Sequence, residues 1–277
     1  GSMVYNVLKS EFDVLLVYRR KVNLEVLNKT YGGVKNHKAL KTDISELFEK
    51  FKQSKGDKEL LKKDRLFNLE VDAIINCAGI IKPYANVNPG FTFFLNGAFP
   101  HMLSSVYKTK LIQITTDCVF SGIKGAPYDE TSIYSPTDLY GLSKSLGEPM
   151  KESLVLRTSI IGPEICNFSS LISWFEKQKI VNGFTNHNWN GMTTRQFGKI
   201  IKTIVSNKKE FPEKGLFHIF SNSITKYELL LLLKEKFNPD CMIKPFKSVK
   251  IDRRLSTINK LNHFLKIPSL TDQIEEL

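Results

Sequence analysis

The chain has 277 residues, of which 42% are hydrophobic and 25% charged, and these proportions exclude a disordered or fibrous protein. No apolar run reaches the roughly 20 residues of a membrane-spanning helix, and no charged leader precedes an apolar stretch. We therefore expect a cytoplasmic protein without membrane contact. The formal net charge of +12 comes from lysines spread along the chain, as in 58–63 and 208–214, without interleaved aromatic residues. This favours a lysine-rich surface, which could attract anionic nucleotides, over a nucleic-acid site.

Strand-like apolar runs alternate with helical patterns over the first 160 residues. Strands are predicted at 13–17, 72–77, 110–115 and 154–157, and helices at 3–9, 45–63, 98–107 and 139–148. The last helix should stop before Pro149, because proline cannot continue the hydrogen-bonding pattern. This alternation predicts an α/β fold with a parallel sheet that is covered by helices on both faces.

After residue 160 the pattern changes. Loops predicted at 162–163 and 183–194 interrupt the alternation, and an amphipathic helix is predicted at 225–237. We therefore expect two domains, residues 1–160 and residues 161–277, with chain exchange between them left open. The second would be a smaller lobe over the carboxyl ends of the strands, where open α/β sheets bind ligands.

The four cysteines are widely separated and form no Cys-x-x-Cys pair, so we expect free thiols and no metal site; they are Cys77, Cys118, Cys166 and Cys241.

Tyr140 and Lys144 stand four residues apart on a predicted helix, which places both side chains on one face. Reduction of a ketone needs a proton at oxygen while hydride arrives at carbon, and a nearby ammonium should lower the pKa of the tyrosine and ease proton exchange. Spacing alone is weak support, because it also occurs at Tyr5–Lys9 and Tyr31–Lys35.

The surroundings distinguish Tyr140 from the other two tyrosines. It opens a helix after a Ser-Pro-Thr-Asp turn, and it follows a predicted strand that carries Thr115 and Thr116 to the carboxyl edge of the sheet. A threonine hydroxyl there can hold a substrate carbonyl against the tyrosine. Thr116, Tyr140 and Lys144 are therefore the candidate catalytic residues.

Three motifs follow one another: Thr-Thr-Asp-Cys-Val-Phe-Ser-Gly at 115–122, Tyr-Gly-Leu-Ser-Lys-Ser-Leu-Gly-Glu at 140–148 and Leu-Arg-Thr-Ser-Ile-Ile-Gly at 156–162. Together they resemble the extended short-chain dehydrogenase/reductases, specifically the dTDP-4-dehydrorhamnose reductase group. The resemblance runs nearly end to end, from Asn-Cys-Ala-Gly at 76–79 to a closing segment at 254–261. It implies a Rossmann-type doubly wound parallel sheet with a smaller C-terminal α/β substrate lobe.

The resemblance also implies roles for residues. Tyr140 would give a proton to the C4 oxygen of a sugar, Lys144 would bind the nicotinamide ribose, and Thr116 would orient the keto group beside Asp117. Other positions implied for the cofactor are Asp43 and Ile44 near the adenine, Asn76, Ala78 and Gly79 near the ribose and pyrophosphate, and Asn96, expected to open the next helix. Asn76, Asn96 and Asp117 have the alternative role of capping local structure.

Two further residues are candidates for substrate binding. Ile160 stands where the rhamnose enzymes often carry an aromatic residue, which weakens any transfer of their sugar specificity. Trp189 lies in the polar loop predicted at 183–194, which either lines the pocket or is an ordinary surface loop.

The end of the first predicted strand indicates which cofactor is preferred. Tyr18-Arg19-Arg20 has no acidic residue to bind a ribose 2′-hydroxyl, and guanidinium groups suit a 2′-phosphate. NADP(H) is therefore favoured, with NAD(H) as the alternative.

The start of the sequence departs from the family pattern. A strand and a Gly-x-x-Gly-x-x-Gly turn, which lets the backbone approach the pyrophosphate, are expected there but are absent from the sequence, and Gly1 falls at the third glycine. Either further residues precede Gly1, or Gly1-Ser2 is a cloning remnant and the native chain starts at Met3.

The leading hypothesis is NADPH-dependent reduction of a nucleoside-diphosphate 4-keto-6-deoxy sugar in surface polysaccharide biosynthesis. A non-catalytic, nucleotide-binding regulatory subunit and a sugar-nucleotide epimerase are the alternatives. The sugar and the nucleoside stay open, and a homodimer is one option for the assembly.

Overall fold

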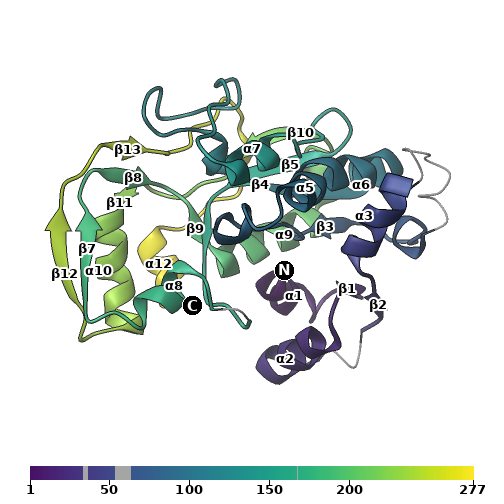
Figure 1. Ribbon diagram of the computed structural model, residues 1–277, viewed down its shortest axis with the longest axis horizontal. Helices are drawn as coiled ribbons and strands as arrows, with labels where there is room; N and C mark the ends of the chain where they lie inside the picture. The colour runs from purple at the N-terminus through teal and green to yellow at the C-terminus, as the bar shows by residue number, and fades with distance from the viewer. Residues whose placement is uncertain (34–36, 54–63, 167) are drawn as a thin grey trace.

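The computed structural model describes residues 1–33, 37–53, 64–166 and 168–277 (Figure 1). Its centre is a four-stranded parallel sheet in the order β10-β5-β4-β3. The strands are β3 (Ile74–Asn76), β4 (Leu111–Thr116), β5 (Leu154–Thr158) and β10 (Gly215–His218). All five residues of β5 are buried, so both faces of the strand are covered. This explains why apolar and polar residues do not alternate along it. The predicted α/β fold with a parallel sheet is confirmed.

Helices cover both faces of this sheet. On one face, α1 (Ser2–Leu8) and α9 (Thr194–Ser206) pack on β4 and β5 through a cluster that includes Val4, Ile112 and Phe197. On the other face, α3 (Ile44–Gln53), α5 (Pro89–Phe93) and α6 (Phe99–Tyr107) pack through a cluster that includes Phe99 and Leu111. Leu111 and Ile112 are neighbours in β4 and so point to opposite faces. The helix predicted over 45–63 extends into 54–63, which lie outside the described residues.

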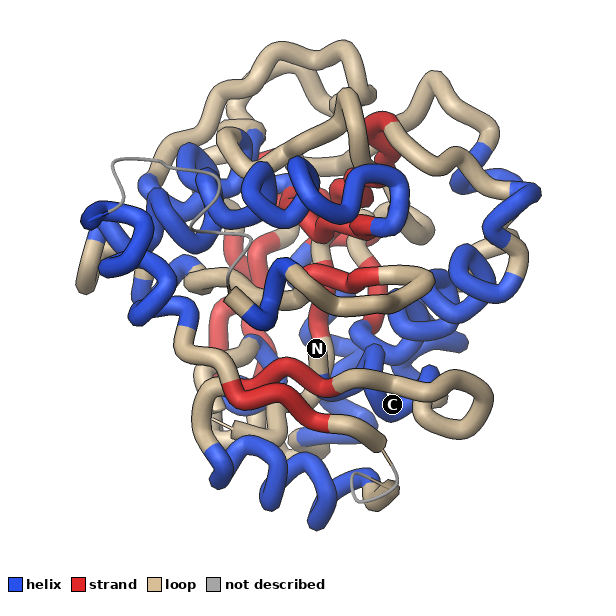
Figure 2. The backbone as a smooth tube through the Cα atoms, turned by 90° about the vertical axis from the view of Figure 1, so that its right-hand side faces the viewer, coloured by secondary structure: helices blue, strands red, loops and turns tan. Residues whose placement is uncertain are grey.

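The N-terminal region contains a second, separate parallel pair. β1 (Leu16–Tyr18) pairs with β2 (Ala39–Lys41), with α2 (Lys21–Tyr31) between them. Figure 2 shows this pair lying apart from the strands of the larger sheet, to which no described hydrogen bond ladder joins it. The predicted strand at 13–17 is therefore shifted toward Tyr18. The residues before β1 lie instead against the face of the sheet that α1 and α9 cover, where Phe12 and Val14 pack.

The C-terminal region gathers around α10 (Lys226–Phe237), close to its predicted range, and packs on a cluster that includes Phe175, Leu229 and Leu270. Its strand pairs are β6 (Ile160–Ile161) with β9 (Met192–Thr193), β7 (Ile180–Phe184) with β12 (Met242–Phe246), and β8 (His187–Trp189) with both β11 (Ile224–Thr225) and β13 (Ile251–Asp252). The remaining helices are α8 (Leu171–Phe175), α11 (Leu261–Phe264) and α12 (Leu270–Glu275).

The prediction of a loop over 183–194 is wrong, because this segment contains the end of β7, all of β8 and β9. β8 is a strand because it pairs with β11 and β13, which lie far along the chain, and no local pattern reveals such pairing. The division into domains at residue 160 stays a prediction. One strand from beyond that boundary, β10, completes the central sheet beside β5.

Two helix predictions near the candidate site also differ from the structure. Asn96 does not open a helix, because α5, a π-helical turn η4 (Phe94–Ala98) and α6 run on continuously and Asn96 lies within the turn. The helix α7 (Leu139–Ser145) ends before the predicted Glu148. Just beyond its end only glycine fits, since a Cβ atom on Gly147 would lie 1.9 Å from the Asn96 carbonyl oxygen. Among the described residues, no helix has the length and apolarity to cross a membrane.

Candidate active site

The turn after β4 presents Thr116 at the carboxyl edge of the sheet. The Thr116 hydroxyl accepts a hydrogen bond from the Cys118 amide and donates one to an Asp117 carboxylate oxygen, each at 3.2 Å. These bonds cap the short 3-10 helix η6 (Asp117–Val119). Thr116 and Asp117 are only 6% and 4% exposed, so little water reaches this turn.

Helix α7 places Tyr140 and Lys144 against this turn. Asp138 caps the helix by accepting a hydrogen bond from the Gly141 amide at 2.8 Å. A Cβ atom on Gly141 would lie 2.2 Å from the Cys118 carbonyl oxygen, so only glycine lets the helix approach this closely. The approach brings the Tyr140 phenol close to the Thr116 side chain, which acts to lower the pKa of the phenol. The three predicted catalytic residues therefore lie together.

The electrostatics of the pair differ from expectation. Burial raises the pKa of Tyr140, and the nearby acidic groups Cys118, Asp117 and Asp138 also raise it, whereas Thr116 lowers it. Burial lowers the pKa of Lys144 to about 8, and its ammonium donates a 2.8 Å hydrogen bond to the Ile114 carbonyl oxygen. The predicted lowering of the Tyr140 pKa is therefore wrong, because loss of water around the phenol has the largest effect on this pKa.

The loop after β3 lies beside Lys144. Asn76 donates to Gln113 Oε1 at 2.7 Å and accepts from the Ala78 amide at 3.1 Å. Asn96 accepts from the Ile80 amide at 2.8 Å and donates to the Ile80 carbonyl oxygen at 3.0 Å. Both asparagines thus fix backbone, which was the alternative to ligand binding.

Asn96 also ties this loop to α7. Its amide nitrogen donates to the Ser143 hydroxyl at 3.0 Å. A Cβ atom on the exposed Gly79 would lie 3.2 Å from Asn96 Oδ1 and 4.0 Å from Lys144 Nζ. Gly79 is therefore an open stretch of backbone next to Lys144. Gly1, at the start of α1, lies against the same loop, since its Cβ would be 3.3 Å from that of Cys77.

The remaining cofactor candidates gather at the carboxyl end of the β1–β2 pair. Asp43 accepts hydrogen bonds from the Ser45 amide at 2.9 Å and hydroxyl at 2.5 Å. The Ser45 hydroxyl is the main reason that the pKa of Asp43 is lowered, and the guanidinium groups of Arg19 and Arg20 contribute. Both arginines are exposed, whereas Ile44 packs into the α3 side of the core.

The substrate candidates are only partly accessible. Burial raises the pKa of Asp117, against the opposing effects of Lys226, Arg253 and hydrogen bonds to Thr116 and Ser159. Ile160 is 43% exposed in β6, but Trp189 is only 3% exposed. The ammonium of Lys226 lies 4.3 Å from the centre of the Trp189 ring. Trp189 therefore supports Lys226 and offers little open surface of its own.

Sequence reasoning missed Lys226 and Arg253, which bring positive charge to Asp117 from the C-terminal region. Thr225 and Glu228 form a capping box at the start of α10. This motif can be recognised in the sequence, and it places Lys226 in the first turn of the helix. No such signal places that helix end near Asp117, because this depends on the long-range pairing of β8 with β11 and β13.

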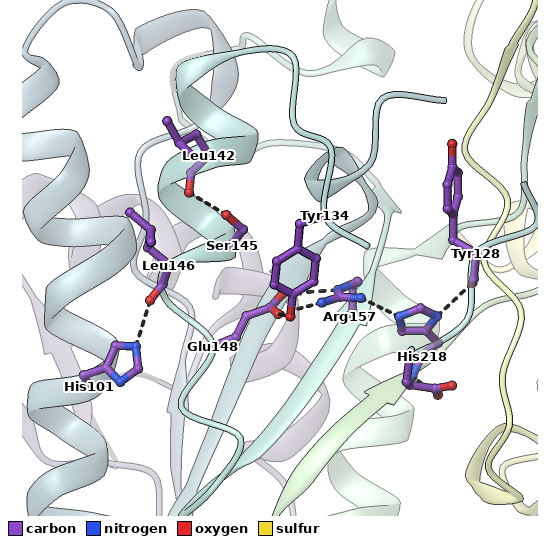
Figure 3. A network of polar contacts seen from close by, with 10 residues as sticks. His101, Tyr128, Tyr134, Leu142, Ser145, Leu146, Glu148, Arg157 and His218 are labelled. Carbon is purple, nitrogen blue, oxygen red and sulfur yellow. Dashed lines mark hydrogen bonds and ion pairs between the residues drawn. The ribbon is translucent and has the colours of Figure 1, made fainter. Parts of the chain in front are cut away.

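A buried polar network supports α7 from behind (Figure 3). Arg157 forms two hydrogen bonds with Glu148, at 2.6 and 3.2 Å, and its guanidinium lies over the rings of Phe120 and Tyr134. Arg157 Nη1 also lies 2.8 Å from His218 Nε2. The two neighbours of His218 Nδ1 are carbonyl oxygens, which only accept, so Nδ1 carries the hydrogen and Nε2 accepts from Arg157.

Comparison with known proteins gives curated relatives that match part of the chain and solved structures that match nearly all of it. Over 153 residues the chain is 31% identical to methionine adenosyltransferase 2 subunit beta of Rattus norvegicus, a match that covers 49% of this chain and 44% of that protein. The chain thus spans about half the length of the curated relatives it matches.

Two solved structures show the fold. A hypothetical dTDP-4-dehydrorhamnose reductase from Sulfolobus tokodaii has a TM-score of 0.68 at 23% identity, covering 92% of this chain and 88% of that one. The dTDP-4-dehydrorhamnose reductase of Bacillus anthracis str. Ames, in complex with NADP, has a TM-score of 0.65 at 18% identity, covering 95% and 97%. These likenesses confirm the predicted Rossmann-type fold. The sequence pattern of the RmlD substrate binding domain family matches residues 56–255. The chain therefore belongs to this family, within the extended short-chain dehydrogenase/reductases.

Proposed function

We propose that this chain reduces the 4-keto group of a nucleoside-diphosphate 4-keto-6-deoxy sugar with NADPH, in the cytoplasm and for surface polysaccharide biosynthesis. The observation that carries the proposal is the close packing of α7, which carries Tyr140, on the turn that follows Thr116 at the carboxyl edge of the sheet. Lys144 lies one helical turn further along the same helix. A relative named as a dTDP-4-dehydrorhamnose reductase was solved with NADP, which supports the choice of reaction and cofactor.

The residues present fit a nicotinamide dinucleotide at both of its ends. Gly79 leaves open backbone beside the Lys144 ammonium, where a ribose would find a donor and space that a side chain would fill. Arg19 and Arg20 are exposed beside Asp43 and supply the positive charge that a 2′-phosphate needs. Gly1, Asn76, Ala78 and Asn96 would shape the segment between these ends, and Ile44 would lie near the adenine.

Each of the site residues would have a different role in the reaction. The bound nicotinamide supplies hydride. The Tyr140 phenol is protonated at neutral pH and would donate this proton to the substrate oxygen. Thr116, whose position is fixed by the η6 cap, would orient the keto group. Asp117 and Ile160 would line the sugar site, with Trp189 behind Lys226.

A regulatory subunit is the second candidate. Curated relatives are named methionine adenosyltransferase 2 subunit beta, which supports this candidate. In this function the chain would bind nucleotide and a partner enzyme without turnover.

The substitution Tyr140→Phe separates the two candidates. We expect it to abolish NADPH consumption with dTDP-4-dehydrorhamnose, followed by absorbance, while the unfolding temperature changes little. Tyr5→Phe is the matched control, because Tyr5 shares the Tyr-x-x-x-Lys spacing but donates its hydroxyl to the Gly32 carbonyl oxygen. Full activity in Tyr140→Phe, or none in wild-type protein across a panel of 4-keto sugar nucleotides, would contradict a reductase.

A further inference from the structure

A lysine from the loop after β3 reaches the start of the helix that carries Tyr140. Lys82 opens the short 3-10 helix η3 (Lys82–Tyr84), and its ammonium lies 2.7 Å from one carboxylate oxygen of Asp138. The other oxygen of Asp138 accepts a hydrogen bond from the Gly141 amide and so caps α7. One carboxylate therefore joins the loop after β3 to the first turn of α7, in which Tyr140 is the second residue.

The Asp138 carboxylate is held in the charged form that both contacts require. Burial acts to raise its pKa, but the Gly141 amide and the Lys82 ammonium, with a contribution from Arg253, outweigh this effect, so the pKa is lowered. A charged carboxylate accepts a stronger hydrogen bond from a helix amide than a neutral acid does. Lys82 therefore stabilises the state of Asp138 that caps α7.

The backbone that carries Lys82 is fixed on both sides. Before it, the amide and the carbonyl oxygen of Ile80 both bond to the Asn96 side chain, at 2.8 and 3.0 Å. After it, the Ala85 carbonyl oxygen accepts from the buried Thr92 hydroxyl at 2.8 Å. A lysine on a fixed backbone loses less conformational freedom on pairing than one on a mobile loop. Its side chain is still 56% exposed, so the ion pair belongs to the weak, solvent-screened class.

Even a weak contact matters at this end of α7. The middle of the helix is fixed by Asn96, which donates to the Ser143 hydroxyl at 3.0 Å. Near its start, Gly141 lies against the Cys118 carbonyl oxygen, where only glycine fits. A shift of the cap therefore moves Tyr140 relative to the turn after β4. In a reaction that depends on alignment, a displacement of about 1 Å can lower the rate by about a hundredfold.

We propose that Lys82 is a positioning residue for the reaction: it holds the Asp138 cap and thereby keeps Tyr140 aligned with the oxygen that it protonates. The inference rests on the proposed function and adds a residue from outside the Thr116, Tyr140 and Lys144 set. Lys82 acts here without touching the ligand. Its loss should therefore slow the chemical step and leave ligand binding nearly unchanged.

Steady-state kinetics of the full chain with NADPH and dTDP-4-dehydrorhamnose test this role. We expect Lys82→Met to lower kcat by about twofold to fivefold, the range that corresponds to an exposed ion pair, with less change in KM. Lys82→Arg should restore most of the rate, because it keeps the charge.

Lys50→Met is the matched control for these measurements. The Lys50 side chain is 58% exposed and pairs at 3.4 Å with Asp64, which caps the helix η2 (Arg65–Phe67) rather than α7. We expect this variant to keep the wild-type kcat. An unchanged kcat in Lys82→Met, an equal loss in Lys50→Met, or a rise in KM alone would overturn the proposal.

Hydrogen exchange of the Gly141 amide separates this proposal from the proposed function. Because this amide is bonded to Asp138, its exchange rate reports how well the cap is held, whether or not the protein reduces a sugar. We expect faster exchange at Gly141 in Lys82→Met than in wild-type protein, Lys82→Arg or Lys50→Met. If wild-type protein consumes no NADPH, the reductase function fails, and exchange alone decides whether Lys82 positions α7. Equal exchange in all four proteins would show that it does not.

Discussion

Lys144 is 8% exposed, and its ammonium is held by one carbonyl oxygen rather than by a carboxylate. Burial lowers its pKa from 10.5 to about 8. Between these two values the unfolded chain binds more protons than the folded one, so the stability of the fold rises with pH across this window. Below about pH 8 the full cost of the buried cation is present.

The substitution Lys144→Met should remove this dependence. We expect wild-type protein to gain free energy of unfolding between about pH 7.5 and pH 9.5, and the variant to gain less, by at most about 1.4 kcal/mol per pH unit. Urea unfolding at several pH values measures the difference. Lys151→Met, at an exposed position, should keep the wild-type slope. The same slope in Lys144→Met and wild type would show that Lys144 does not titrate as its burial implies.

The sequence predicted which residues lie together at the site but not how burial shifts their pKa values. Tyr140, Lys144 and Thr116 could be named because motif order and helix spacing are local properties. The direction of the Tyr140 pKa could not, because it depends on burial and on the η6 turn lying against α7. Lys226 and Arg253 were missed for the same reason, since each comes from an element that long-range pairing brings to Asp117.

Helix α7 and the chain that follows it lie so close to two other backbone segments that only glycine fits at each contact. Its first turn lies against the Cys118 carbonyl at Gly141, and the chain after it lies against the Asn96 carbonyl at Gly147. The π-helical turn η4 supplies the second surface and also directs the Asn96 side chain to Ser143. A π-turn inside a helical run is frequent at functional sites, and here it fixes the spacing between the loop after β3 and α7.

The substitution Gly141→Ala should displace α7. The added Cβ would lie 2.2 Å from a backbone oxygen, so we expect a loss of about 1–3 kcal/mol in unfolding free energy and a large loss of reductase activity. Thermal unfolding and NADPH consumption measure the two effects. Gly90→Ala in α5 is the control, since its Cβ would be 3.7 Å from the nearest atom, Asn88 Oδ1. An active, stable Gly141→Ala protein would contradict this close contact.

At the level of elements, the local sequence pattern decided which helices and strands could be predicted. β3, β4, β5 and α10 were found close to their predicted ranges, because apolar runs and helical periodicity mark them. β8 and β9 were predicted as a loop, since their polar residues are stabilised by distant partners. Asn96 was placed at a helix start because no sequence pattern distinguishes a π-turn from a helix boundary.

Across the whole molecule, the network around the Glu148–Arg157 pair joins parts that are far apart in sequence, because Arg157 also contacts His218 (Figure 3). Glu148 follows α7, Arg157 lies in β5, and His218 in β10 contacts the carbonyl oxygens of Tyr128 and Ser256. Glu130 adds a further link, accepting hydrogen bonds from the Thr257 hydroxyl and the His218 amide. The network therefore connects the sheet, the candidate site and the closing segment.

A double-mutant cycle should reveal this connection. We expect Arg157→Met to cost about 3–5 kcal/mol in unfolding free energy, because Glu148 would stay buried and unpaired, and Glu148→Gln to be similarly costly. The double variant should lose clearly less than the sum of the two. The Lys199–Glu276 pair on the surface is the control, with a coupling of about 0.5 kcal/mol or less. Additive effects at Glu148 and Arg157 would mean that the pair is not coupled.

The position of β10 has a consequence for synthesis of the chain on the ribosome. β4 and β5 can pair as soon as residue 158 has emerged, but β5 gains its other neighbour only when His218 is available. Until then one edge of β5 has free amide and carbonyl groups, and Arg157 lacks the histidine that accepts from it. Such an edge can pair with another nascent chain. The interval between residues 158 and 218 is therefore the stage at which this protein most needs protection from aggregation.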